Sequence, residues 1–189
     1  MPDYCKNELI VSGANVTKVL DFINNPDSED EDEQIFDFNK LIPYPEEFAS
    51  ADKRAAEYGD RLFAIDKDAK DNLKELALLN QEYGFEPDAS SCPDGYNHGS
   101  HDWCVDHLGT KWSTISVVLS QAPDRAVLNY DTAWAPPLPV IQQLAETFPG
   151  YEFDFQYFEG GMGFCGQLQY KNGKEVMNIS DDYDGPRGC

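Results

Sequence analysis

Basic residues are scarce in this chain. Its 189 positions hold 14 lysines and arginines against 35 acidic residues, so the formal net charge is -21. Affinity for nucleic acids comes largely from Lys and Arg side chains that neutralise phosphates, and anionic membranes attract the same side chains. The sequence therefore predicts neither direct binding to nucleic acid nor binding to a membrane surface.

Long apolar segments are missing as well. No run of the chain reaches the roughly 18 apolar residues that indicate a membrane-spanning helix. The chain opens on a polar stretch rather than on the apolar core of a secretory signal. We therefore expect a cytoplasmic protein.

Cysteines are few, and their number is odd. The five are Cys5, Cys92, Cys104, Cys165 and Cys189. Small secreted domains held together by disulfides carry denser, paired sets. The sequence therefore predicts reduced thiols rather than a disulfide framework.

Aromatic residues, by contrast, are plentiful, with 11 Phe, 10 Tyr and 3 Trp. A chain of this length with this many large apolar side chains can bury a substantial core. We expect one domain over residues 1–189, with a helical insert at about 50–84 and a loop at 85–102.

The apolar spacing alternates between strand and helix patterns. Helices are predicted at residues 16–23 and 140–148, where apolar residues recur every three or four positions. Asn15 is predicted to cap the first of these helices. Within the insert we expect a short helix at 51–58, followed by one that begins at Asp66 and ends before Gly84. Strands are predicted at residues 7–12, 35–38, 113–119, 126–131, 151–159, 164–170 and 175–179. This order favours an α+β fold of the split β-α-β type, with an antiparallel sheet and helices on one face.

All three histidines lie in one stretch, residues 98–112. His98, His101, Cys104 and His107 recur every three residues and are the candidate metal ligands. However, four ligands along a single helix cannot surround an ion, so a zinc site would need a further ligand such as Cys92 or Cys5. We therefore expect no metal and no cofactor, and a short helix near residues 102–108 that Trp103 and Trp112 pack onto the sheet.

Cys104 beside His101 or His107 could also form a thiolate pair, because an imidazolium lowers the pKa of a neighbouring thiol. The three-residue spacing follows from helix geometry alone, and no oxyanion-hole motif accompanies it. No catalytic residue is assigned, and the chain is expected to be a non-enzyme.

Two glycine- and proline-rich segments have architectural interpretations. Residues 160–163 lack the lysine and the following helix of a phosphate loop, so they are predicted to form a tight turn between strands. Trp134 is expected to pack the corner between a strand and a helix that Pro136 and Pro137 begin, and it is also a candidate binding residue.

Four segments together resemble the YubB-like family of phage and plasmid proteins. They are MPDYCKNEL (residues 1–9), LGTKW (108–112), TAWAPP (132–137) with Pro149 after its helix, and EGGMGF (159–164). The resemblance implies a ferredoxin-like fold without an iron–sulfur cluster. It also implies an origin in a mobile element, so that the cytoplasm expected above would be the cytosol of the host cell. It implies no activity, because no catalytic residues are established for this family.

The acidic residues supply a mechanism. Residues 28–33 are predicted to be a flexible, solvated acidic loop. Acids on rigid elements lose less entropy on binding and are better placed to meet a partner. The candidate partner-binding residues are Asp66, Asp68, Asp71, Glu75, Glu152 and Asp154, together with Trp134.

We therefore expect a non-enzymatic accessory protein that binds a host protein with a basic surface. It would act as an acidic mimic of nucleic acid that inhibits a defence component. One alternative is a small enzyme or metal-binding protein that uses residues 98–107. Another is an acidic structural or regulatory module. The oligomeric state stays open.

Overall fold

The computed structural model describes residues 3–65, 72–86, 89, 91–183 and 185. The chain divides into two compact units, of which one comprises Met1–Pro43 with Asp102–Cys189 and the other Tyr44–His101. Each unit is considered by itself.

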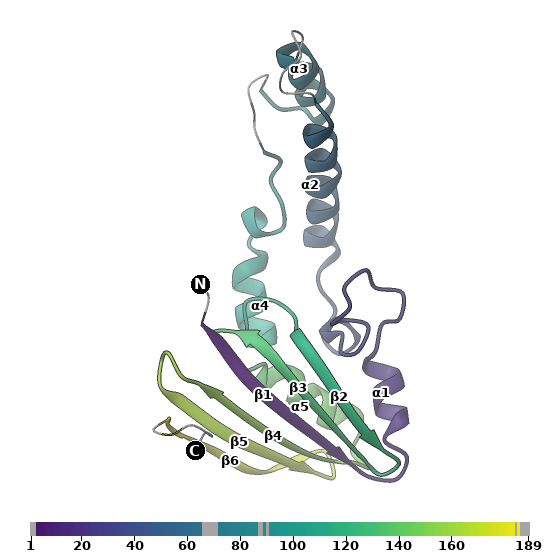
Figure 1. Ribbon diagram of the computed structural model, residues 1–189, viewed down its shortest axis with the longest axis vertical. Coiled ribbons are helices and arrows are strands. Elements are labelled where there is room, and N and C mark those ends of the chain that lie inside the picture. The colour runs from purple at the N-terminus through teal and green to yellow at the C-terminus, as the bar shows by residue number, and fades with distance from the viewer. Residues whose placement is uncertain (1–2, 66–71, 87–88, 90, 184, 186–189) are drawn as a thin grey trace. The chain divides into compact units, whose positions relative to one another are not determined.

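The first unit contains a six-stranded antiparallel sheet in the order β2-β3-β1-β4-β5-β6 (Figure 1). Hairpins join β2 to β3, β4 to β5, and β5 to β6, while β1 lies at the centre and β2 and β6 form the edges. The strands are β1 (Tyr4–Ser12), β2 (Ile115–Ala122), β3 (Arg125–Ala133), β4 (Glu152–Glu159), β5 (Phe164–Lys171) and β6 (Lys174–Asp182).

One face of this sheet is the core. Leu9 of β1 pairs with Leu128 and Phe155, and Phe155 pairs with Leu168, so four apolar side chains form a continuous row on this face. None of the four is more than 2% exposed. Alternate residues such as Ile10 and its cross-strand partners Val127 and Asp154 lie on the opposite face and are half-exposed, as the two-residue period of a strand requires.

Two helices cover the core face. α1 (Thr17–Ile23) buries Val19 and Ile23, and α5 (Leu138–Thr147) buries its own apolar stripe and lies behind the sheet in Figure 1. The rings of Phe22 and Phe148 meet edge-on at 5.2 Å, which places the two helices side by side on that face. The predicted α+β fold with helices on one face is confirmed.

The second unit is helical. It contains α2 (Glu46–Ala64), α3 (Asn72–Tyr83) and the 3-10 turn η2 (Tyr96–His98). Its buried residues include a polar pair, in which the Tyr58 hydroxyl donates to Asn80 Oδ1 at 2.7 Å and the Asn80 amide donates to the carbonyl of Ala89 at 3.0 Å. As predicted, Gly84 ends α3 in a left-handed conformation, with φ at +75°. The helix α4 (Ser100–Leu108) crosses the boundary between the units.

Three local predictions are wrong. The segment at 35–38 is a turn that leads into the 3-10 helix η1 (Phe38–Lys40), and its backbone bonds to neighbours such as Ile23 rather than to a strand. The helix predicted at 51–58 extends in both directions to form α2. Asn15 does not cap α1, because it adopts a positive φ of 63°. The predicted cap at Asp66 lies outside the described residues.

Within the described part of the chain, no helix is both long and apolar enough to cross a bilayer.

Candidate functional site

Segments from four parts of the sequence meet at one end of the sheet. We define the motif end as residues 3–7, 109–112, 132–136 and 159–163. The Trp134 amide donates to the carbonyl of Asp3 at 3.0 Å, and the Thr110 hydroxyl donates to the carbonyl of Ala133 at 3.0 Å. Gly161 lies so close to Asp3 that an added Cβ would sit 3.0 Å from its Cγ. The motif end is therefore one packed structure.

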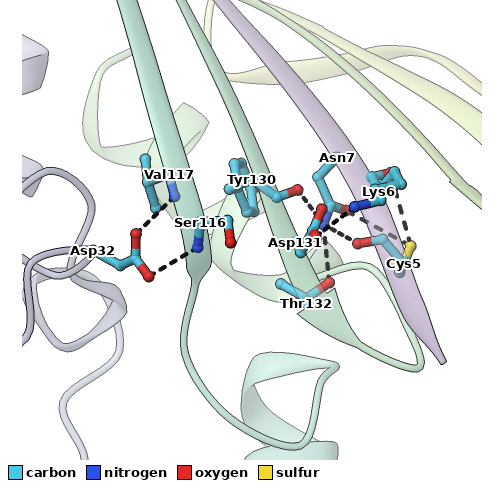
Figure 2. A network of polar contacts seen from close by, with 9 residues as sticks. All are labelled: Cys5, Lys6, Asn7, Asp32, Ser116, Val117, Tyr130, Asp131 and Thr132. Carbon is cyan, nitrogen blue, oxygen red and sulfur yellow. Dashed lines mark hydrogen bonds and ion pairs between the residues drawn. The ribbon is translucent and has the colours of Figure 1, made fainter. Parts of the chain in front are cut away.

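A buried polar cluster lies within the motif end (Figure 2). The side-chain amide of Asn7 donates to Thr132 Oγ1 at 2.9 Å and to the carbonyl of Cys5 at 3.0 Å. The Thr132 hydroxyl donates in turn to the carbonyl of Ala135 at 2.8 Å. Asn7 and Thr132 are almost fully buried, so these bonds replace water that neither residue can reach. The cluster joins β1 to β3 and to the segment that enters α5.

Glu159 performs the same role on the other side of β1. Its carboxylate accepts hydrogen bonds from the backbone amides of Gly161, at 2.9 Å, and Met162. The side chain is only 2% exposed. A buried carboxylate is costly unless backbone donors satisfy it, and here two donors of the glycine turn do so. The carboxylate of Glu159 thus holds the turn at 160–163 in place. The turn joins strands β4 and β5, as predicted.

Burial raises the pKa of the Cys5 thiol to about 12, and the negative charges of Glu159 and Asp131 add to the effect. A thiol with such a pKa stays protonated at neutral pH and is a poor nucleophile. On the opposite face, Lys6 forms an ion pair with Asp131 at 2.5 Å. The protonated thiol of Cys5 and the ion pair of Lys6 favour a structural role for residues 3–7.

Cys5 should therefore resist thiol reagents in the folded protein. At pH 8 we expect it to react with iodoacetamide at least about 100-fold more slowly than Cys92, a free and partly exposed thiol. Peptide mapping by mass spectrometry after timed labelling measures both rates. In urea the two rates should converge, and equal rates in the folded protein would contradict the protection of Cys5.

Aromatic side chains form part of the exposed surface of the motif end. Trp134 is 42% exposed and adopts a positive φ of 68°, which is unusual for a bulky residue. The Lys111 ammonium lies over the rings of both Trp112 and Trp134, at 4.8 Å from each centroid. Trp134 therefore does more than pack the corner predicted for it, because it presents a ring face to a cation.

The acidic loop differs from its prediction. Asp32 is hydrogen-bonded to the edge strand β2. Its two carboxylate oxygens accept hydrogen bonds from the backbone amides of Ser116 at 2.8 Å and Val117 at 2.7 Å (Figure 2). Ser116 has a positive φ of 56°, and the pairing of β2 with β3 is irregular there. This irregularity turns the two amides toward one carboxylate. The prediction of a flexible loop is wrong, because the loop is anchored to the sheet.

Further bonds order the same loop internally. The Asp32 amide donates to Asp30 Oδ1 at 2.9 Å, and the Ser28 hydroxyl donates to Glu33 at 2.8 Å. Partial burial raises the pKa of Glu33, while the bond from Ser28 partly offsets the rise. The side chains that stay exposed around these anchors are Asp27, Glu29, Asp30 and Glu31.

The predicted partner-binding acids are in contrasting surroundings. Asp154 accepts from Gln167 and Gln169, and Glu152 pairs with Lys171 at 3.1 Å. The two acids line a cavity of about 260 Å³ together with Lys171 and with Arg125, which offsets their charge. Glu75 is exposed on α3 of the second unit. The remaining candidates, Asp66, Asp68 and Asp71, lie outside the described residues.

The histidine stretch spans the two units. His98 and His101 belong to the helical unit, where the ring of His101 contacts Tyr96 at 5.6 Å, while Cys104 and His107 belong to the sheet unit. The ring of His107 stacks on Trp103 at 4.7 Å. Trp103 therefore contacts a histidine of its own helix, which the sequence did not indicate. Among the described residues, no group of three or more His, Cys, Asp or Glu side chains is arranged to hold a metal ion.

The thiols differ in state. Among the described cysteines, Cys5, Cys92 and Cys104 form no disulfide, whereas Cys165 is disulfide-bonded, which corrects the expectation of a reduced thiol there. Disulfide formation depends on the distance between cysteines in the folded chain, which sequence spacing does not reveal.

The strands and helices from α4 to β6 have a family counterpart. Residues 98–186 match the family model described as the ferredoxin-like domain in Api92-like protein. This Api92-like segment contains β2 to β6 and α5, whereas β1 and α1 precede it. The match supports the ferredoxin-like fold, and it does not confirm the YubB-like resemblance.

A solved structure extends the likeness over the chain. The crystal structure of the protein Api92 from Yersinia pseudotuberculosis has 14% sequence identity and a TM-score of 0.55. The comparison covers 98% of this chain and 99% of that one. At this identity the likeness shows the fold alone. No curated protein matches the sequence.

Sequence reasoning missed two central residues, Asp32 and Glu159. Asp32 stood in a run of like charges, which gave it no individual signal. Glu159 did carry a signal, because an acid directly before Gly160 and Gly161 ends an apolar strand and faces a turn rich in free amides.

Proposed function

We propose that this protein is a non-enzymatic binding module of a mobile element and that it engages a basic surface on a host protein. The observation that carries the proposal is the anchored acidic loop in a chain of net charge -21. Charge of one sign steers and selects a complementary partner. The mobile-element origin rests on the YubB-like resemblance.

The order of the loop matters for the energetics. Fixing a flexible backbone costs roughly 1–2 kcal/mol per residue, and an anchored loop has already lost much of that freedom during folding. Asp32 holds the loop to the sheet, while Asp27, Glu29 and Glu31 stay exposed. A preformed pattern of carboxylates is what a groove that follows phosphates can accept. This supports a nucleic-acid-mimicking inhibitor of a defence component, with the loop as a contact surface.

The face of the sheet opposite the core also favours a protein partner over nucleic acid. Ferredoxin-like sheets can present aromatic side chains to single-stranded RNA, but such surfaces also need cations that track the phosphates. Here Lys6 is paired with Asp131 and Lys171 with Glu152. These pairs neutralise two lysines of this face, and Arg125 lies beside Glu152 and Asp154, so the face is poorly suited to a nucleic-acid backbone and favours a protein partner.

The test is a pull-down from bacterial extract, followed by affinity measurements on the purified partner. Neutralising the loop with Asp27→Asn, Glu29→Gln and Glu31→Gln should weaken binding at least about tenfold at low salt. These three side chains make none of the anchoring bonds. Raising the salt should weaken binding of the unaltered chain, because exposed charges are screened beyond about 8 Å at physiological ionic strength.

A charge-matched control separates pattern from net charge. Glu47→Gln, Glu57→Gln and Asp60→Asn remove the same charge from the exposed surface of α2. If both triple variants bind equally weakly, net charge alone drives association. Salt-independent binding would refute the proposal.

A further inference from the structure

Two indole rings and one ammonium form a compact group at the motif end. Lys111 Nζ lies 4.8 Å from the ring centroid of Trp112 and 4.8 Å from that of Trp134. Both distances are within the roughly 6 Å over which an aromatic face attracts a cation. The group therefore has the composition of an aromatic site for a positive charge, and the chain's own lysine occupies it.

The backbone holds Trp134 in this arrangement. Its φ of 68° lies in the left-handed region, which costs a bulky residue conformational energy. The surrounding structure enforces this conformation, since the Trp134 amide bonds to Asp3 and the adjoining Ala135 amide bonds back to Ala133. Although tightly held, the side chain stays 42% exposed. A rigid, exposed tryptophan is a typical anchor of protein recognition, because ordering it costs little on binding.

The Lys111 ammonium can be displaced from the two indole rings by another cation. Lys111 precedes Trp112 directly, and its ammonium is attached by a flexible four-carbon chain, whereas tryptophan faces bind the planar guanidinium of arginine especially well. A cation from another chain can replace the ammonium without disturbing the backbone bonds that hold Trp134.

We propose that Trp112 and Trp134 form a binding site for a cationic side chain of a partner protein, preferably arginine, and that Lys111 occupies this site until the partner displaces it. The inference deepens the proposed function, on which its biological context rests. It names the contact through which an acidic protein would recognise one particular cation on a basic surface.

The test needs no partner, because N-acetyl-arginine amide carries the same cation. The indole N–H signals of the three tryptophans report binding separately by NMR, once single Trp→Phe variants have assigned them. With Lys111→Met we expect the arginine amide to shift the Trp112 and Trp134 signals, leaving Trp103 unmoved. Its dissociation constant should be at least about fivefold lower than for the unaltered chain, because the internal competitor is gone.

The controls isolate the cation and the ring. The uncharged isostere N-acetyl-citrulline amide should not bind, and Lys174→Met, which removes an exposed lysine of β6, should behave like the unaltered chain. Adding Trp134→Ala to Lys111→Met should abolish the response. Trp112→Leu provides the same test if the Trp134 variant does not fold.

The proposal fails if Lys111→Met binds the arginine amide no more tightly than the unaltered chain. It also fails if the citrulline amide binds equally well, or if Trp103 shifts as much as the other two. Failure of this titration with an intact salt-dependent partner complex removes only the cation site. A positive titration with no partner complex removes only the proposed function.

Discussion

Replacing Glu159 by Ala is expected to lower the free energy of unfolding by about 3 kcal/mol, because two amides lose their acceptor. Those amides belong to Gly161 and Met162, and Glu159 itself is only 2% exposed. Urea unfolding followed by circular dichroism measures the change.

Glu152→Ala is the matched control on the same strand. Glu152 lies at the other end of β4, where it is exposed and forms one surface ion pair with Lys171. Such pairs contribute roughly 0–1 kcal/mol, so the control should lower the free energy of unfolding by no more than about 1 kcal/mol. Equal losses for the two variants would show that the turn does not depend on the Glu159 carboxylate.

Glu159 also influences the thiol across the cluster. Its negative charge contributes to the raised pKa of Cys5, second only to burial. In Glu159→Ala the thiol pKa should therefore fall, which would let the rate of iodoacetamide labelling rise at a lower pH. Since burial remains the larger cause, the pKa should stay above the ordinary value for cysteine.

Asp32→Asn is expected to cost about 2 kcal/mol of stability, because hydrogen bonds from two amides to one carboxylate are charge-assisted and an asparagine side chain can accept only with its single oxygen. The amides are those of Ser116 and Val117 on the edge strand β2. Hydrogen exchange at these two amides should accelerate, and chemical denaturation gives the accompanying loss of stability.

Glu31→Gln removes the same unit of charge one position earlier. Glu31 is exposed and takes no part in the bonds that hold the loop, so its replacement should change stability by no more than about 0.5 kcal/mol. A matching loss in the Glu31 variant would mean that charge repulsion, and not the anchor, governs this loop. Under the proposed function, Asp32→Asn should also weaken partner binding, because the exposed acids lose their fixed positions.

The anchor gives the edge strand a second property. An unpaired strand edge can recruit another chain, and proteins commonly block such edges with charge, irregular pairing or a covering loop. On β2, Asp32 occupies two amides at the point where the strand pairing becomes irregular. One side chain thus orders the acidic loop and closes part of an edge.

Strong periodic patterns in the sequence predicted the fold well. The alternation from Phe153 to Tyr157 and the stripe of Val140, Ile141 and Leu144 each indicated one buried face, and the structure buries those residues. The prediction of a strand at 35–38 was wrong because the buried aromatic rings of this segment belong to a turn. Short apolar runs carry no information about which backbone groups will pair.

The sequence by itself determined the acidic character, the glycine turn and, apart from the segment at 35–38, the element order of the sheet unit, because composition and periodicity depend only on neighbouring residues. The tertiary structure alone decided that Asp32 reaches Ser116 and that Lys111 meets Trp134. The sequence indicated Trp134 as a candidate binding residue but did not indicate that Lys111 lies over its ring. Contacts between segments far apart in the chain arise from sheet register and from backbone conformations such as the positive φ of Ser116 and Trp134. Local patterns do not encode these, because packing of the whole unit enforces them.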